Sequence, residues 1–370
     1  MKKSLLYITL MAFLAGPMVD VTVAEASSSS SSTQSHSSES KSKAKSGKKL
    51  KSKAKSRIKA KAKKKLKSRK RGKAVARAMT PLRAASANAS GATELDLRSG
   101  AAIVVDQKTG EALYAKNVDI PTPIASITKL MTAMVTLDAG LSMDDEITIS
   151  SEDVDRLKGT SSRLALGTTL SRGELMHLAL IASENRAASA LSRAYPGGRD
   201  AFIAAMNHKA RAIGMKETRF VDGTGLNSNN RATAADLVKM VDAAYRYPMI
   251  RDISSTGAYD VGLPAKRVVK IREDGRIRRV TREVTRQVAF HNTNALTRNH
   301  DWDIGISKTG YINEAGRCLV MQARISEKPV IIVLLDSWGK WSRIGDANRI
   351  KKWLESSNHM ASHASVQDSV

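Results

Sequence analysis

The sequence predicts an α+β domain in which an antiparallel sheet of about five strands is flanked by helices. Three observations support this prediction. Large apolar side chains are scarce between residues 27 and 92 and frequent after residue 93. Strand-like apolar runs lie near both ends of the region 93–358, and apolar residues at helical spacing lie between them. In a chain with 42% hydrophobic residues, a region of this size can bury a sizeable core.

The N-terminal 92 residues are predicted to lie outside the globular domain. Two lysines precede a mostly apolar stretch, residues 5–19, and small residues that end at Ala26. This order is typical of a secretory signal peptide, so we expect residues 1–26 to direct export. Residues 27–92 are rich first in serine and then in lysine. We expect them to form a disordered basic tail, because they cannot bury enough apolar surface to offset the entropy of ordering.

The basic tail also explains the charge of the chain. Residues 41–73 hold 19 Lys or Arg and no Asp or Glu, and subtracting these 19 from the formal net charge of +26 leaves +7. Such a segment binds polyanions through counterion release, so a polyanion-binding protein is one functional alternative. The tail has no aromatic residues for base stacking, and we expect no specific nucleic-acid site. Anionic cell-envelope polymers are the expected partners of residues 41–73.

The predicted domain begins with strands, continues with helices and returns to strands. Residues 100–117 form two strand-like runs around a Gln-Lys-Thr-Gly turn, which predicts a β-hairpin. Residues 124–140 carry apolar side chains at helical spacing and end at a glycine. Ser171 and Glu174 form a capping box that opens a second helix. The other predicted elements are a helical run to Tyr195, a helix over 233–247, strands over 304–308, 318–325 and 330–335, and a helix over 347–354.

Ser126 and Lys129 are a candidate catalytic pair. Residues three apart on one helix share a face, so the amine can reach the hydroxyl. The pair lies in the first helical turn, where free N–H groups and the helix dipole favour an anion, and the Ser126 N–H is a candidate oxyanion donor. Lys129 can act as a base only if burial and a second cation lower its pKa. Lys308 is the candidate for that cation.

The pattern Ser-x-x-Lys is uninformative by itself, because the basic tail repeats it. Copies of other motifs also occur: Lys108-Thr-Gly110 lies in a hairpin turn, and Ser228-Asn-Asn230 resembles Ser-x-Asn. Order and context therefore decide. One set runs in order through suitable structures: Ser126-x-x-Lys129 opening a helix, Ser183-Glu-Asn185 between helices, and Lys308-Thr309-Gly310 on a strand.

These three motifs resemble the signature of the serine penicillin-recognising superfamily. The residues around them resemble the low-molecular-mass D-alanyl-D-alanine endopeptidases, and the resemblance covers about residues 93–356. It implies a sheet with helices on both faces and a helical subdomain, with the site in the cleft between them. The expected organisation is a signal peptide over 1–26, a tail over 27–92, a catalytic domain over 93–358 and a C-terminal tail over 359–370.

The resemblance implies how the first two motifs act. Ser126 attacks the D-alanyl carbonyl, and Lys129 takes its proton. Ser183 relays a proton to the leaving amine. Asn185 holds the peptide chain of the substrate, and water finally hydrolyses the acyl-enzyme.

The third motif is implied to bind the substrate. Lys308 and Thr309 face it near the acyl bond, and Gly310 leaves room for its backbone. The backbone N–H groups of Ser126 and Tyr311 form the oxyanion hole.

The implied activity is that of a periplasmic serine DD-endopeptidase that cleaves D-alanyl cross-links in peptidoglycan. A DD-carboxypeptidase, which removes a terminal D-alanine with the same motifs, is the alternative. β-Lactams are the expected covalent inhibitors. The chain has no Glu-x-x-Leu-Asn that could supply the deacylating carboxylate of class A β-lactamases, so penicillin should acylate Ser126 and leave slowly.

Residues 266–287 depart from the family pattern. They are rich in Arg and Val around Asp274-Gly275, which predicts an added basic hairpin. A solvated ribbon is the favoured interpretation, and a contact surface for an anionic polymer is the alternative.

No other chemistry is predicted. The seven histidines show no metal-binding spacing, and we expect neither a metal nor another cofactor. Cys318 is the only cysteine and lies in an apolar strand-like run, where a buried, inert thiol is expected.

Overall fold

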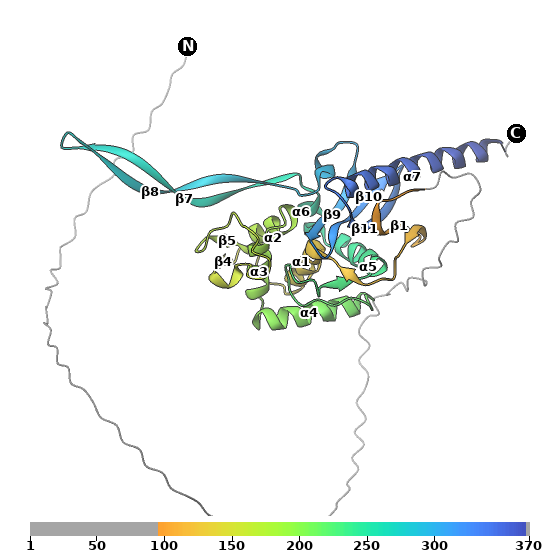
Figure 1. The fold of residues 1–370 in the computed structure, drawn as a ribbon, viewed down its shortest axis with the longest axis horizontal. Coiled ribbons are helices and arrows are strands. Elements are labelled where there is room, and N and C mark those ends of the chain that lie inside the picture. Colours follow the sequence, from red (N-terminus) through yellow and green to blue (C-terminus); the bar gives the residue numbers. More distant parts are fainter. Residues whose placement is uncertain (1–94, 368–370) are drawn as a thin grey trace, which may run out of the picture. The chain divides into compact units, whose positions relative to one another are not determined.

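The computed structural model describes residues 95–367, with side chains as far as residue 357 (Figure 1). The predicted signal peptide and basic tail, residues 1–92, lie outside the described residues. Among the helices of the described part, none is long and apolar enough to cross a membrane.

A five-stranded antiparallel sheet forms the centre of the domain and confirms the predicted α+β class. The flanking strands are β2 (Ala112–Lys116) and β9 (Asp303–Ile312). Between them lie β1 (Ser99–Asp106), β11 (Lys328–Ser337) and β10 (Gly316–Ile325), in that order. The first two and the last three strands of the described chain therefore meet in one sheet, although residues 117–302 separate them.

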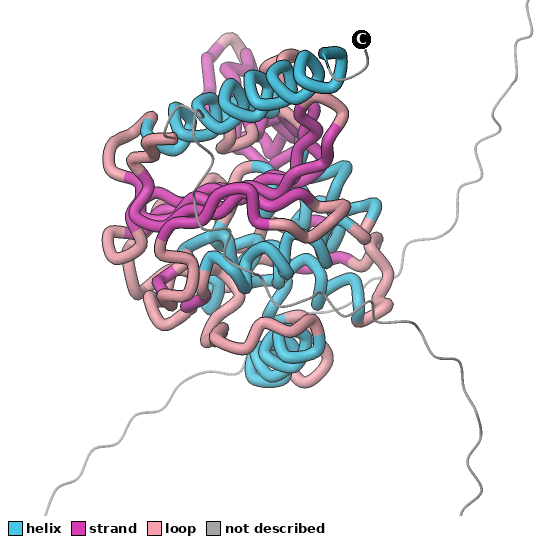
Figure 2. The backbone as a smooth tube through the Cα atoms, turned by 90° about the vertical axis from the view of Figure 1, so that its right-hand side faces the viewer, coloured by secondary structure: helices cyan, strands magenta, loops and turns pink. Residues whose placement is uncertain are grey.

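Helices cover both faces of this sheet (Figure 2). On one face, buried Val104 and Leu334 lie in a core with Ile350 of α7 (Ser342–Gln367). On the other face, Ile103 and Val333 lie in a larger core that includes helices α1 to α6. Because both faces are covered, the central strands are apolar at nearly every position instead of alternating with polar residues.

Six helices form the larger layer. Four correspond to predicted elements: α1 (Thr128–Asp138), α2 (Arg172–Ile181), α3 (Asn185–Arg193) and α5 (Ala234–Tyr245). The capping box of α2 is present, with the Glu174 N–H donating to Ser171 Oγ at 3.1 Å and the Ser171 N–H donating to Glu174 Oε2 at 2.8 Å. The sequence did not predict the other two helices, which are α4 (Gly198–Ala212) and α6 (Pro248–Ser255).

The remaining strands form three two-stranded sheets. Two are small: β3 (Thr122–Pro123) pairs with β6 (Arg231–Ala232), and β4 (Glu146–Thr148) pairs with β5 (Thr169–Ser171). The third is a hairpin of β7 (Ala258–Glu273) and β8 (Arg276–His291), which extends away from the helices and the main sheet in Figure 1. The hairpin includes the predicted residues 266–287 and is longer than predicted.

The C-terminal helix also differs from its prediction. We expected a helix over 347–354, whereas α7 begins at Ser342 and continues to Gln367. Its first half is anchored by Asp346, whose carboxylate accepts hydrogen bonds from the backbone N–H of Ser99 at 2.8 Å and from Ser99 Oγ at 2.5 Å.

Candidate active site

Ser126 lies in a 3₁₀ turn, η1 (Ala125–Ile127), which leads into α1. The sequence predicted the first turn of an α-helix here, so this detail was wrong. Ala125 has a positive φ of 48°, and the side chains on either side of Ser126 are fully buried. The turn is thereby held in place on both sides of the candidate nucleophile.

Two glycines allow other segments to approach this turn closely. A Cβ atom on Gly310 of β9 would lie 2.9 Å from the Ile124 carbonyl oxygen and 3.2 Å from the Ser126 nitrogen. A Cβ on Gly225, which has a φ of 81°, would lie 2.0 Å from the Ala125 carbonyl oxygen. Only glycine leaves this space, so strand β9 and the loop 222–227 both lie directly against the backbone of the candidate nucleophile.

Lys129 is fully buried, and its Nζ has three hydrogen-bond partners. These are Ser126 Oγ at 2.9 Å, Asn185 Oδ1 at 2.8 Å and the carbonyl oxygen of Thr224 at 2.7 Å. A neutral amine has two N–H donors and one lone pair. The amide and carbonyl oxygens can only accept, so they take both N–H groups and leave the lone pair facing the hydroxyl of Ser126. The arrangement can therefore transfer a proton from the hydroxyl to the amine.

Burial lowers the pKa of Lys129 to about 7, although the carboxylates of Asp222 and Glu184 act in the opposite direction. A substantial share of Lys129 is therefore the free base near neutral pH. The sequence predicted two causes, burial and the second cation Lys308. Burial is the main cause for Lys129, and the charge interaction between the two lysines contributes to the lowered pKa of Lys308.

Lys308 forms a second buried amine site beside Ser183. Its Nζ donates to Ser183 Oγ at 3.0 Å and to the carbonyl oxygen of Thr309 at 3.0 Å. Burial lowers the pKa of Lys308 well below 10.5, and nearby Lys129 and Arg343 lower it further. Ser183 itself has a φ of 59° in the short link between α2 and α3. This strained conformation aims its hydroxyl at Lys308.

The remaining motif residues lie around these two amines. Asn185, the first residue of α3, uses its Oδ1 for Lys129 and donates from Nδ2 to Thr160 Oγ1 at 3.0 Å. Thr309 Oγ1 donates to Thr293 Oγ1 at 2.6 Å. Tyr311 is different, because the residue is 52% exposed and its ring centroid lies 4.5 Å from the Arg317 guanidinium carbon. The structure thus brings all three predicted motifs together, with Tyr311 on the outer surface of β9.

Asp222 organises a loop that the sequence did not single out. Its carboxylate accepts hydrogen bonds from the backbone N–H groups of Thr224 and Gly225, both at 2.6 Å, and of Asn227 at 2.8 Å. This loop supplies the Thr224 carbonyl to Lys129 and presses Gly225 against Ala125. The visible signal was Asp222-Gly-Thr-Gly225, an aspartate followed by residues typical of tight turns.

Asn230 fixes the same loop from the other side. Its fully buried amide donates to Thr128 Oγ1 at 3.0 Å and accepts from the Val221 N–H at 2.7 Å. In the sequence this residue was part of Ser228-Asn-Asn230, which was set aside as a chance match to the second motif. Its function is to hold the loop 222–227 against α1, and that function has no sequence motif of its own.

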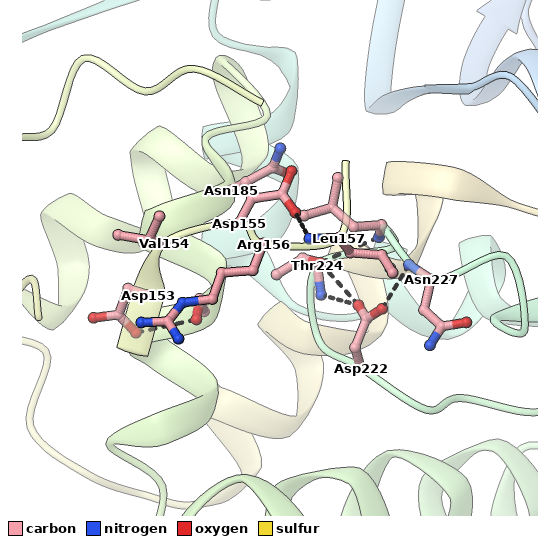
Figure 3. A pocket seen from close by; sticks show the side chains of 11 residues that line it. Asp153, Val154, Asp155, Arg156, Leu157, Asn185, Asp222, Thr224 and Asn227 are labelled. Atoms are coloured by element: carbon pink, nitrogen blue, oxygen red, sulfur yellow. Dashed lines mark hydrogen bonds between the residues drawn. The ribbon is translucent and has the colours of Figure 1, made fainter. Parts of the chain in front are cut away.

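A cavity of about 290 Å³ opens beside these residues. Figure 3 shows Asp153 and Val154 on one side of it and Asp222 and Asn227 on the other. Asn185 and Thr224 also line this pocket, so it borders the two oxygen acceptors of Lys129. The carboxylates in its wall already have partners: Asp153 is paired with Arg193 at 2.9 Å, and Asp155 caps the turn before Thr160.

Cys318 and the metal-binding side chains contribute no further site. Cys318 is buried, as expected, and burial raises the pKa of its thiol to about 11, which keeps it protonated at neutral pH. Over the described residues, no group of three or more His, Cys, Asp or Glu side chains is arranged to hold a metal ion.

Comparisons with known proteins agree with this geometry. The model of the D-alanyl-D-alanine carboxypeptidase family, peptidase S11, matches residues 86–339. A D-alanyl-D-alanine endopeptidase of Pseudomonas aeruginosa is 44% identical over 260 residues, which cover 70% of this chain and 78% of the relative. A protein of the same name from Escherichia coli is 41% identical, with 75% and 84% covered. The crystal structure of the Streptomyces K15 DD-transpeptidase matches with a TM-score of 0.61 and 28% identity, over 70% of this chain and 98% of that chain.

Proposed function

Because the chain belongs to the D-alanyl-D-alanine carboxypeptidase family of serine peptidases, we propose that it is a DD-endopeptidase that cleaves D-alanyl cross-links of peptidoglycan through an acyl-enzyme on Ser126. The observation that carries the mechanism is the buried Lys129 amine, 2.9 Å from Ser126 Oγ and with a pKa of about 7. A serine hydroxyl is a weak nucleophile unless an adjacent base takes its proton.

In the first step, the Lys129 lone pair takes the proton of Ser126, and Oγ attacks the D-alanyl carbonyl carbon. The substrate oxygen becomes an oxyanion, stabilised by the backbone N–H groups of Ser126 and Tyr311. Such donors each contribute roughly 2.7–4 kcal/mol to lowering the barrier. Gly310 supports this assignment, because the absence of a side chain there lets strand β9, which includes Tyr311, pack directly against the backbone of Ser126.

Collapse of the tetrahedral intermediate breaks the peptide bond and requires a proton for the leaving amine. Ser183 is the proposed donor, since its hydroxyl can pass on a proton while Lys308, 3.0 Å away, replaces it. Asn185 and Thr309 hold the substrate chain on either side of the acyl bond. Before the second half of the reaction, Lys129 releases the proton that it took from Ser126 to solvent, and Lys308 regains one. The free Lys129 amine then takes a proton from the water that attacks the acyl-enzyme and returns it to Ser126 Oγ as the ester bond breaks.

Preference for cross-linked substrate is proposed from the two relatives above 40% identity, which are named endopeptidases, while more distant relatives are named carboxypeptidases. The two activities differ in what the leaving-group side of the cleft admits. Incubation with cross-linked muropeptide dimers and with monomeric pentapeptides separates them. We expect the dimers to be cleaved faster; loss of D-alanine from pentapeptides alone would make the enzyme a carboxypeptidase.

The assignment of the nucleophile is tested with a fluorescent penicillin. The wild-type protein should become covalently labelled and keep the label, and Ser126→Ala should not be labelled. The loss of a serine nucleophile lowers turnover by roughly 10⁶-fold in other serine peptidases. Ser183→Ala is the comparison, because it should still acylate slowly. Persistent labelling of Ser126→Ala would exclude Ser126 as the nucleophile.

We also propose export to the periplasm through residues 1–26, attachment of residues 41–73 to anionic envelope polymers, and a catalytic domain over 93–358. The proposal rests on the order of basic, apolar and small residues at the N-terminus and on the 19 cations of the tail. Sequencing the N-terminus of the mature protein tests the first part. Deleting residues 41–73 should lower salt-sensitive binding to isolated envelopes and leave cleavage of small muropeptides unchanged.

A further inference from the structure

The outer part of the β7–β8 hairpin, residues 266–286, is called the arm here. Its base is fixed to the domain: the Arg163 guanidinium lies 3.6 Å from the Phe290 ring centroid, and the rings of His177 and Tyr259 stack at 4.3 Å. Beyond this base, the arm carries nine Lys or Arg and three Asp or Glu, and all nine basic residues are exposed. The arm is therefore a two-stranded ribbon whose base is packed against the domain and whose exposed surface is strongly positive.

Most cations of the arm lack an internal counter-charge, although Glu283 lies directly opposite Lys266 and Glu273 opposite Arg276. Among the described residues, only Arg278 of the nine forms an ion pair, with Glu273 at 3.0 Å. Two cross-strand positions place like charges directly opposite each other: Arg267 faces Arg282, and Lys270 faces Arg279. Such pairs destabilise a hairpin. The structure therefore tolerates repulsion that an external anion would relieve.

The two like-charge pairs lie on opposite faces of the ribbon. Side chains alternate between faces along a strand, and 267 and 270 differ by an odd number. A flat surface, such as a bilayer, contacts one face of a ribbon, whereas a flexible chain can contact both. The turn at the tip carries Glu273 and Asp274, which disfavours insertion of the tip into an anionic membrane.

The residue types of the arm indicate which class of anionic partner it binds. Residues 262–288 include no aromatic side chain for stacking on nucleobases, nor the tryptophan or tyrosine anchors typical of protein interfaces. Seven of the nine cations are arginines, whose guanidinium groups bind phosphate through paired hydrogen bonds.

From these observations we propose that the arm is a binding site for a flexible, phosphate-bearing polymer without bases, which contacts both faces of the ribbon along roughly 25 Å. The base of the arm joins the active-site region directly: the Thr293 N–H, two residues after β8, donates to the Ile181 carbonyl at 3.0 Å, and Thr293 Oγ1 accepts from Thr309. A polymer bound to the arm thus lies close to the active-site cleft.

The test uses the full chain, long-chain inorganic polyphosphate and phenylglyoxal, which modifies accessible arginines. Peptide mass spectrometry reads each arginine separately, so binding by the tail does not obscure the arm. The reporters are Arg278, Arg282 and Arg286, and exposed Arg211 of α4 is the internal reference. We expect polyphosphate to slow modification of the reporters severalfold, to leave Arg211 unchanged and to lose its effect at high salt. Equal effects at all four positions, or none, would overturn the proposal.

A charge-neutralised variant and its matched control complete the test. Arg267→Gln, Lys270→Gln and Arg279→Gln together should abolish protection of the three reporters. Arg211→Gln, Lys216→Gln and Arg219→Gln together remove the same charge from exposed positions elsewhere and should leave protection of the reporters intact. Both variants should react with fluorescent penicillin at the wild-type rate, which shows that they are folded. If anionic vesicles or single-stranded DNA protect the reporters and polyphosphate does not, the partner is a membrane or a nucleic acid and the proposal is wrong.

Discussion

The cleft and the arm both depend on cationic side chains, but their surroundings are opposite. In the cleft, Lys129 and Lys308 are almost completely buried, and each amine is held by oxygen acceptors at 2.7–3.0 Å. In the arm, Lys270 and Arg279 face each other in solvent. Burial penalises the charged amine and produces a base near neutral pH, while exposure leaves a surface of positive charge.

The largest expected effect separates the two kinds of lysine. Lys129→Met keeps a long, unbranched side chain and removes the base, so β-lactam acylation should fall by about 10²–10⁴-fold. Lys270→Met makes the same chemical change on the arm and should leave acylation unchanged. Stopped-flow measurement with a fluorescent penicillin compares the two rates. Equal rates for the two variants would show that Lys129 is not the base.

The second comparison is between a glycine beside the cleft, Gly225, and a glycine at the tip of the arm, Gly275. Gly225→Ala would force a Cβ to within 2.0 Å of the Ala125 carbonyl oxygen at a φ of 81°. It should lower the free energy of unfolding by about 2–5 kcal/mol, because strain and overpacking add. The corresponding fall in Tm is roughly 5–15 °C.

The matched control for this glycine lies at the tip of the arm. Gly275 has a similar φ of 73°, but a Cβ there would meet nothing within 4 Å. Gly275→Ala should therefore cost only the conformational strain, about 1–2 kcal/mol, and confine it to the turn. Thermal unfolding and penicillin labelling of both variants test the contrast. A larger loss from Gly275→Ala would mean that the loop 222–227 yields easily.

The pH dependence of acylation also distinguishes the buried Lys129 from the exposed cations of the arm. Since the pKa of Lys129 is lowered to about 7, the free base increases as pH rises through that value. The acylation rate should rise with pH to a plateau near pH 8, and at pH 6 it should be about tenfold below the plateau. The triple arm variant Arg267→Gln, Lys270→Gln, Arg279→Gln should show the same midpoint. A rate that does not vary between pH 5.5 and 8.5 would contradict the role of Lys129.

The sequence predicted most of the sheet, four helices of the larger layer and part of α7, because their apolar runs are long and regular. It missed α4, which begins at the last residue of Pro196-Gly197-Gly198, a combination that usually ends a helix or strand. In the protein Gly197 adopts a φ of 84° as the N-cap, and the helix then buries Phe202, Met206 and Ala210 at four-residue spacing. That spacing was visible, but the breakers before it outweighed the pattern.

The site shows a different limit of prediction. The sequence identified Ser126, Lys129 and Lys308 because their chemistry is carried by side chains in ordered motifs. It missed the Thr224 carbonyl, since every residue has a backbone carbonyl and only the fold decides where it points. It named burial and Lys308 as causes of the lowered pKa of Lys129 but not burial as the larger one, because the extent of burial is not visible in a motif.

The smallest expected effect concerns the cost of like charges in the arm. Arg282→Glu would place a carboxylate opposite Arg267 and replace repulsion with attraction. The arm should become more stable by about 0.2–1 kcal/mol, since that is the usual contribution of an oppositely charged cross-strand pair.

Hydrogen exchange of the backbone amides around Val269 and Val280 should slow accordingly, while the protection of Arg278 and Arg286 by polyphosphate should weaken. If Arg282→Glu makes the arm more stable and weakens polyphosphate binding, the stability of the arm and its polymer binding are separate properties. The facing arginines then serve binding and not the stability of the hairpin. Unchanged or faster exchange in Arg282→Glu would instead mean that solvent already screens the facing arginines, and that their repulsion is no argument for an anionic partner.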